Sequence, residues 1–193
     1  MAATQSGTRV SLTPRAQQIA VEARALLEER GRDALSMRNI AARIGIRAAS
    51  LYEHFADKRA VENAIIAAGL YEQGDFIAAR LAEFPDDVPM RVVAEAYRDF
   101  ALAHPALYSL TMSRGLDREA PDVAPAERYA AGFLRRAVGA DRWELGLAFW
   151  AFAHGVIDLE MHDRLPPNRD PRDVWEEGLE ALLTDLGAPS PQA

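Results

Sequence analysis

Residues 36–55 read SMRNIAARIGIRAASLYEHF, and this stretch decides the fold. Ser36 is a typical N-cap residue, and the apolar residues after it predict a short helix that ends at Gly45. The apolar residues after the glycine predict a second short helix. Helices shorter than about 12 residues are not stable alone in water, so both must pack against a third helix. The residues expected to face it are Ile40, Ile44, Ile46, Leu51 and Phe55.

Two short helices joined by a turn of three or four residues with a glycine are typical of a helix-turn-helix, a motif that binds DNA. Small residues at the start of the second helix would let it enter the major groove, and Tyr52, His54 and Lys58 can reach phosphates. An ordinary helical hairpin in an all-α core is the alternative. The outward face would carry Arg47, Ala48, Ser50, Tyr52, Glu53 and His54.

The rest of the chain is also predicted to be helical, with helices bounded by proline, glycine and N-cap residues. About nine helices and no convincing strand make the fold class all-α. We expect a helix-turn-helix domain at 10–56, linked through a helix at 57–82, an effector-binding and dimerisation domain at 57–187, and a loose tail at 188–193. The other expected helices run from Pro14 to Gly31, Pro89 to His104, Ala106 to Met112, Pro125 to Gly139, 141 to 163 (with a capping-box-like start at Asp141 and Glu144) and 170 to 186.

Composition narrows the function classes. The 193 residues include no cysteine, which excludes disulfides, thiolate metal sites and cysteine nucleophiles. The net charge is −7, yet residues 9–59 hold ten basic and six acidic residues, so this segment is +4 and the remainder −11. Such asymmetry indicates a basic surface for polyanions on an acidic body, unless it arose by chance.

The longest apolar stretch, Leu145–Ile157, is too short to span a bilayer, and the first ten residues lack a secretory pattern. We therefore expect a soluble, cytoplasmic protein without a membrane partner.

From about Pro14 to Ala68 the chain resembles the DNA-binding domain of the tetracycline-repressor (TetR/AcrR) family of bacterial transcription regulators. The matching stretches are LLEERGRDALSMRNIAARIGI and SLYEHFADKRAV. The rest is more weakly similar, through FALAHPALYSL and FWAFAHGVIDLE, to the C-terminal domain of a subgroup with a W-x-x-x-H-G element, here Trp150 to Gly155. Members of this family are typically homodimeric repressors that release a DNA operator when a small molecule binds the C-terminal domain.

The resemblance implies that Ser36 caps the first helix of the motif, that Tyr52 and His54 touch the DNA backbone and that Lys58 grips a phosphate. Arg47 departs from the family, which usually places a small hydroxyl residue there as a cap. An arginine could instead reach a guanine or a phosphate, or remain a solvated surface residue, and Arg38 has the same alternatives. The DNA-binding candidates are Ser36, Arg38, Arg47, Ala48, Ser50, Tyr52, His54 and Lys58.

Aromatic residues with a few polar neighbours on two helical segments predict a small-molecule pocket, although each aromatic alone is more simply a core residue. The effector-binding candidates are Tyr97, Phe100, His104, Tyr108, Met112, Phe149, Phe152, His154 and Asp158. His154 and Asp158, four residues apart, also leave open an all-α enzyme, but no catalytic, phosphate-binding or metal-binding spacing supports it. We expect neither a metal nor a cofactor. A helical protein-interaction module is another alternative, which leaves the basic N-terminal third unexplained.

A single short helix reads too few base pairs, so we expect a homodimer that places two such helices about 34 Å apart on a palindromic operator. The expected dimer surface is formed by the last two helices, packed against their copies as a four-helix bundle. Its apolar candidates are Leu145, Leu147, Trp175, Leu179, Leu182 and Leu183.

Overall fold

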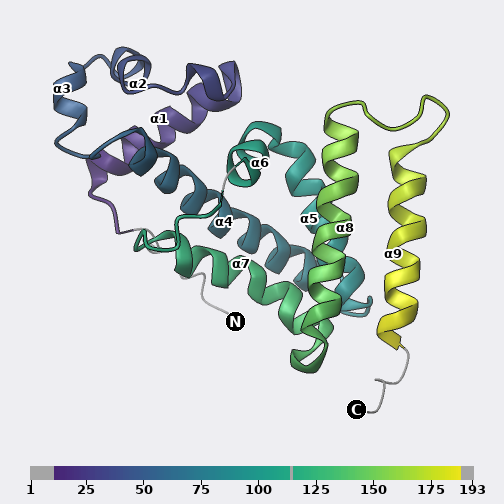
Figure 1. The fold of residues 1–193 in the computed structure, drawn as a ribbon. Coiled ribbons are helices and arrows are strands. Elements are labelled where there is room, and N and C mark those ends of the chain that lie inside the picture. The colour runs from purple at the N-terminus through teal and green to yellow at the C-terminus, as the bar shows by residue number, and fades with distance from the viewer. Residues whose placement is uncertain (1–10, 114, 188–193) are drawn as a thin grey trace. The chain divides into compact units, whose positions relative to one another are not determined.

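The structure is a computed structural model that describes residues 11–113 and 115–187, with side chains up to residue 184. Nine α-helices and two short 3-10 helices form this part of the chain, and it contains no β-strand, which confirms the all-α prediction (Figure 1). The predicted tail at 188–193 lies outside the described residues. The elements are α1 (Pro14–Arg30), η1 (Arg32–Ala34), α2 (Met37–Arg43), α3 (Ala48–Leu51), α4 (Lys58–Glu83), α5 (Pro89–Ala103), α6 (Pro105–Met112), α7 (Val123–Val138), η2 (Ala140–Arg142), α8 (Trp143–Met161) and α9 (Pro171–Gly187).

The helices pack into two compact units that do not follow chain order. Unit 1 contains the residues up to Glu72 together with His104–Ala130, and unit 2 contains Gln73–Ala103 together with the residues from Ala131 onward. Both α4 and α7 continue along the chain from one unit into the other. The predicted division at residues 56 and 57 concerns function rather than packing, and it stays a prediction.

Unit 1 begins with α1, whose start and end are set by local chemistry. The hydroxyl of Thr13 accepts a 3.3 Å hydrogen bond from the backbone N–H of Ala16, and Pro14 occupies the first helical position. Gly31 ends the helix at φ 74°, a conformation that favours glycine. Both α2 and α6 pack against this helix, and one of its faces carries an apolar stripe that is buried: Ile19, Ala20, Ala23, Leu26 and Leu27.

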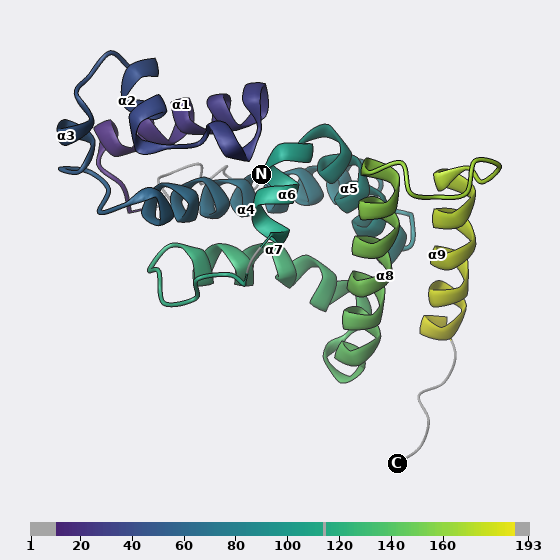
Figure 2. The same cartoon turned by 45° about the horizontal axis from the view of Figure 1, so that its top comes forward.

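Two later helices, α6 and α7, pack against α4 within unit 1, and they lie beside it in both views (Figures 1 and 2). A Cβ atom at Gly69 of α4 would lie 2.7 Å from the methyl carbons of Leu107, so glycine allows α6 to approach the α4 backbone closely. Ala67 of α4 forms a buried cluster with Val123 and Ala126 of α7. These contacts explain why residues 104–130 belong to the same unit as the N-terminal helices.

Unit 2 is built around Trp175, which is fully buried. Its ring stacks on Phe152 at 5.6 Å and meets Phe149 edge-on at 6.3 Å, so α8 and α9 share one aromatic core. A Cβ atom at Gly178 would lie 2.2 Å from the Phe152 ring, and glycine there allows the two helices to pack closely. The expectation that Trp175 and Leu179 form the dimer surface was wrong, because both side chains are fully buried inside their own subunit.

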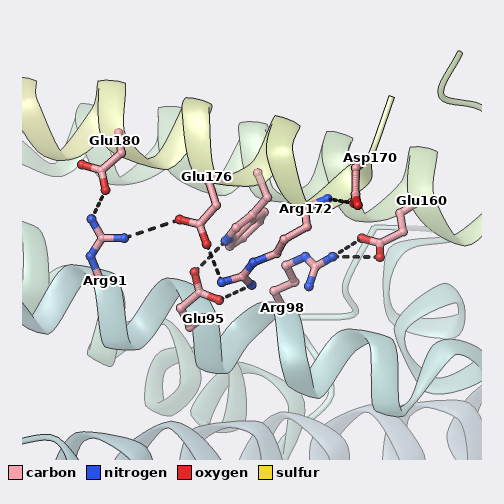
Figure 3. Close-up of polar contacts among 9 residues, drawn as sticks. Arg91, Glu95, Arg98, Glu160, Asp170, Arg172, Glu176 and Glu180 are labelled. Atoms are coloured by element: carbon pink, nitrogen blue, oxygen red, sulfur yellow. Dashed lines mark hydrogen bonds and ion pairs between the residues drawn. The ribbon is translucent and has the colours of Figure 1, made fainter. Parts of the chain in front are cut away.

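Charged residues one helical turn apart along α5 bind α8 and α9 (Figure 3). Nη2 of Arg98 donates to both carboxylate oxygens of Glu160 on α8 at 2.8 and 2.7 Å. Glu95 accepts hydrogen bonds from Arg172 at 2.7 Å and from the indole of Trp175 at 2.9 Å. At the other end of α5, Arg91 pairs with Glu176 and Glu180 of α9. Three helices of unit 2 are thus joined by ion pairs as well as by apolar contacts.

Two predicted helix starts differ from the observed ones. Asp141 and Glu144 do not form a capping box, because residues 140–142 form η2 and the N-cap of α8 is Arg142, which makes no side-chain cap bond. The helix expected to follow Pro125 begins at Val123, and Pro125 is tolerated because it lies in the first turn. No helix in the described part of the chain is long and apolar enough to cross a bilayer. The same residues contain no group of three or more side chains that could hold a metal ion.

Candidate nucleic-acid interface

The first helix of the predicted motif, α2, begins as the sequence predicts. Ser36 has extended backbone angles, and its hydroxyl accepts a 3.2 Å hydrogen bond from the backbone N–H of Asn39, which confirms it as the N-cap. The side-chain amide of Asn39 donates back to the carbonyl of Ala34 at 2.9 Å. Ile40 and Ala41 are buried against unit 1. The helix is thereby fixed at its start and along its inner face.

The turn after α2 is a Schellman motif centred on Gly45. This residue has φ 71°, its N–H donates to the carbonyl of Ala42, and the N–H of Ile46 donates to the carbonyl of Ala41. These bonds satisfy the last carbonyls of α2 and reverse the chain within a few residues. The predicted glycine turn is therefore present, and its geometry fixes where the next helix begins.

The second helix of the motif, α3, is shorter than expected and spans only Ala48–Leu51. Leu51 and Phe55 are buried, but residues 52–54 lie in a turn rather than in the helix. Arg47 is the N-cap residue and makes no side-chain cap bond, as its chemistry predicts. Its side chain is exposed to solvent at the N-terminal end of α3.

The basic residues between positions 9 and 59 differ in whether they form ion pairs within the chain. Arg43 is used internally: its Nε donates to Glu22 at 2.9 Å, and its two terminal nitrogens each donate to Glu29 at 2.7 Å. These bonds fasten α2 to α1, and the hydrogen bond from Arg43 lowers the pKa of Glu29. Arg38 and Arg47 are exposed and make no ion pair with any residue that the structure describes. Their charges therefore remain available to a polyanion.

Lys58 lies at the first position of α4, behind the motif, where the helix dipole also favours an anion. Asp57 caps this helix through a 2.8 Å bond from the N–H of Ala60. The ammonium of Lys58 is 3.6 Å from Glu62, a carboxylate only 5% exposed that also lies 3.9 Å from Arg32. Nevertheless, 43% of the Lys58 side chain is exposed, so it can still reach a phosphate.

All eight predicted DNA-binding residues belong to unit 1 and lie between the start of α2 and the start of α4. Arg38, Arg47 and Tyr52 are exposed, Tyr52 by 54%. The other five are partly exposed: Ser36, Ala48, Ser50, His54 and Lys58. Ser36 has a demonstrated structural role as a cap, and the contacts that these residues make with DNA remain predictions.

The predicted effector residues fall into both units. In unit 1, His104 lies 3.5 Å from Nη2 of Arg24 and 3.9 Å from Glu72, while Tyr108 is buried and Met112 is partly exposed. The members in unit 2 are Tyr97, Phe100 and Phe149, which are buried, and Phe152, His154 and Asp158, which are partly exposed.

Asp158 and His154 contact neighbouring side chains of unit 2, just as Phe149 and Phe152 contact Trp175. Asp158 pairs with Nδ1 of His162 at 3.2 Å. His154 stacks on Trp150 at 6.1 Å. The predicted pocket itself remains a prediction.

Four of the six residues predicted for the dimer surface are at least partly exposed in the structure. Leu147 is 45% exposed on α8, and Leu145, Leu182 and Leu183 are partly exposed. Trp150, the first residue of the W-x-x-x-H-G element, is 43% exposed one helical turn beyond Leu147. Its three-residue spacing from Leu147 is the signal that could have placed it on this surface.

Comparisons with known proteins agree with this geometry. The model for bacterial regulatory proteins of the tetR family matches residues 19–65, and the model for the tetracyclin repressor-like C-terminal domain matches residues 90–182. An uncharacterized HTH-type transcriptional regulator of Mycobacterium tuberculosis is 27% identical over 70% of this chain. The match spans 65% of that relative's own length.

Solved structures show the same fold. A protein with unknown function from Rhodococcus sp. RHA1 is 21% identical, with a TM-score of 0.74 over 97% of this chain and 100% of that chain. BioQ, solved with its double-stranded DNA operator, is 21% identical, with a TM-score of 0.60 over 90% of this chain and 98% of that chain. The two matching models cover most of the chain, and both describe one class of DNA-binding transcription regulators rather than enzymes. The chain therefore belongs to the tetR family of bacterial regulatory proteins.

Proposed function

We propose that the protein is a homodimeric transcriptional repressor, which binds a palindromic operator and releases it when a small-molecule effector binds. The observation that carries this proposal is the motif formed by α2 and α3. Its turn is fixed by Gly45, and Arg38 and Arg47 are exposed and unpaired beside it in a chain of net charge −7. Ion pairs within unit 1 occupy Arg24, Arg32, Arg43 and Arg59. Arg38 and Arg47 make no ion pair with a described residue and lie within the motif itself, so these two are the cations best placed for DNA.

Within this proposal the eight candidate residues divide by chemistry. Tyr52, His54 and Lys58 bind phosphates, which positions the protein on the duplex without reading its sequence. Arg47 stands at the start of α3, the end of a recognition helix that meets base edges, so it is the proposed base reader. BioQ, whose structure contains its double-stranded DNA operator, has the same fold, which supports the proposal of operator binding. A DNA-binding regulator of a bacterium would act in the cytoplasm.

The homodimer rests on the exposed apolar face of α8. Leu147 and Trp150 expose large apolar side chains on one side of this helix, and an exposed apolar patch is typical of a protein interface. Leu145, Leu182 and Leu183 complete the proposed surface. A two-fold dimer would carry two motifs and would match the two halves of a palindrome.

The effector is proposed to bind among the aromatic side chains of the C-terminal domain. Tyr108 tests this directly, because Tyr108→Phe keeps the packing and removes only the hydroxyl. For a screened inducer, this variant should change the concentration that releases DNA while operator affinity stays normal. Unchanged release in Tyr108→Phe, Tyr108→Ala and His154→Ala would overturn the pocket but not the DNA binding.

A gel-shift assay with fragments of the source genome tests the DNA-binding proposal. Saturable binding of a discrete fragment that weakens with salt would support the regulator. The assay should begin at about 50 mM salt, where phosphate contacts are strong. No binding to any fragment under that condition would favour the alternative of a helical protein-interaction module.

A further inference from the structure

Eight residues between α6 and α7, residues 115–122, bind three separate elements of unit 1; we call this segment the strap. Figure 2 shows the connection that contains it, leading into the start of α7. The contacts of the strap are with the segment before α1, with α4 and with α7.

The contact with α4 is made by Asp117. Its Oδ2 accepts a hydrogen bond from Nε of Arg59 at 2.9 Å and another from the side-chain amide of Asn63 at 3.0 Å. These two donors lie one helical turn apart in the first two turns of α4, directly behind Lys58. The bond from Asn63, followed by the one from Arg59, lowers the pKa of Asp117, so the carboxylate is charged at neutral pH.

The contact with the N-terminal segment is made by Asp122. Its carboxylate accepts a 2.9 Å bond from the backbone N–H of Ser11 and a 3.3 Å bond from the Ser11 hydroxyl. Ser11 precedes the cap of α1 by two residues. The strap therefore binds unit 1 at the entrance to α1 as well as at the start of α4.

The contact with α7 is both apolar and ionic. Leu116 and Ala120 pack against the buried cluster of Ala67, Val123 and Ala126. Arg118 pairs with Glu127 on α7. The strap thus cannot move with α7 without disturbing its bonds to α4 and to Ser11.

We infer that the strap couples DNA binding at the motif to α7, with Asp117 as its bond to the DNA-binding end of α4. This inference rests on the proposed DNA-binding function. The strap grips α4 and α7, the two helices that continue along the chain into unit 2. Two sites are energetically coupled only through contacts that differ between their states, and the Arg59–Asp117 bond lies where such a difference would be transmitted.

The test is hydrogen–deuterium exchange of the full chain, with and without a duplex that the wild-type protein selects from a random-sequence library. Asp117→Asn breaks the ion pair, and Glu119→Gln is the matched control. Glu119 is an exposed acid two residues away that forms no ion pair with a described residue, so its variant makes the same change in net charge.

The duplex should slow exchange in α7 about fivefold or more in the wild type and in Glu119→Gln. In Asp117→Asn, exchange in α1 to α3 should still slow, while the effect in α7 should fall below about twofold. The coupling would be overturned if the duplex slowed exchange in α7 equally in Asp117→Asn and in Glu119→Gln. It would also be overturned if the duplex slowed exchange in the wild-type motif but not in the wild-type α7. A wild type that selects no duplex would instead overturn the proposed function.

A second pair of variants tests the same coupling if Asp117→Asn does not fold, which a melting curve would reveal. Arg59→Gln breaks the same bond from α4. Arg15→Gln removes an equal charge from α1, where the guanidinium bonds to Gln18 and to no other described residue. Loss of the α7 response in Arg59→Gln alone would support the strap. The same response in both variants would overturn it.

Discussion

Nη2 of Arg98 donates hydrogen bonds to both carboxylate oxygens of Glu160, and this pair joins α5 to α8 in the interior of unit 2. Arg98 is only 7% exposed, and its guanidinium also lies 5.7 Å from the centre of the Trp175 ring. Its Nε is buried and makes no hydrogen bond with any described residue. A buried arginine with one carboxylate partner depends strongly on that partner, because an unpaired charge in the interior is costly.

Removal of the partner should therefore destabilise the protein more than removal of the arginine. Glu160→Ala is expected to lower the free energy of unfolding by about 3 kcal/mol, because the Arg98 charge stays buried without compensation. Arg98→Met should cost less, since an apolar side chain of similar length fills the space. Urea denaturation measures both, and Glu177→Ala, an exposed acid on α9, is the control. Equal losses in Glu160→Ala and Glu177→Ala would contradict this account.

Two glycines of unit 2 should respond in opposite directions to the same substitution. Gly178→Ala places a Cβ atom 2.2 Å from the Phe152 ring, which is held by Trp175, so it should destabilise by about 2 kcal/mol. Gly155→Ala meets no atom within 4 Å and lies inside α8, so it should stabilise by about 0.5–1 kcal/mol. Thermal unfolding of the two variants checks the pair. Similar melting temperatures would show that α8 and α9 do not pack as described.

The proposed dimer surface predicts a change of oligomeric state. Trp150→Glu places a charge on the exposed apolar face of α8 and should convert dimers to monomers in sedimentation equilibrium. Operator affinity should fall with it, because a monomer carries one motif. Val21→Glu is the control, since Val21 is 66% exposed on α1 outside this surface. A Trp150→Glu protein that stays dimeric would exclude this face.

The DNA contacts should separate by salt dependence and by sequence preference. Lys58→Ala should weaken binding to all duplexes and reduce the slope of log affinity against log salt by about one. Arg47→Ala should cost about 1–3 kcal/mol on the operator and less on random DNA. Fluorescence anisotropy at several salt concentrations measures both. Equal losses on both duplexes would reduce Arg47 to a backbone contact, and an unchanged slope would remove Lys58 from the phosphates.

The pH dependence of stability should reveal the charge on Asp117. Its pKa is lowered in the folded protein, so its bonds with Asn63 and Arg59 contribute stability above the carboxyl's ordinary pKa of 3.8. This contribution disappears as the pH falls through the lower folded value. The wild type should therefore be more stable than Asp117→Asn at pH 6–7, and the difference should shrink below about pH 4. A constant difference across this range would mean that the charge plays no part.

Features set by local chemistry could be predicted from the sequence. Ser36 and Gly45 act through backbone groups within a few residues, so the cap and the turn of the motif are as expected. Asp57 likewise caps α4 through a bond to a residue three positions away. The α3 helix is shorter than predicted, because apolar spacing fixed the buried Leu51 and Phe55 but not the conformation of the residues between them.

Features set by tertiary packing could not be predicted. Apolar spacing predicts that Trp175 and Leu147 each lie on the apolar face of a helix. Only the packed structure shows that Trp175 is buried and Leu147 is exposed. The bonds of Asp117 join residues 54 and 58 positions apart, which no local pattern indicates. The DNA and effector contacts also depend on molecules that neither the sequence nor the chain's own packing specifies.

In the proposed complex, two copies of the α2–α3 motif bind one palindromic operator. The most direct measurement is a titration of the duplex selected by the wild-type protein against a scrambled duplex of equal composition, with stoichiometry from sedimentation velocity. We predict two chains per palindrome and an affinity at least about 10³-fold above that for the scrambled duplex at physiological salt. Equal affinity for both duplexes, or one chain per palindrome at saturation, would contradict this account.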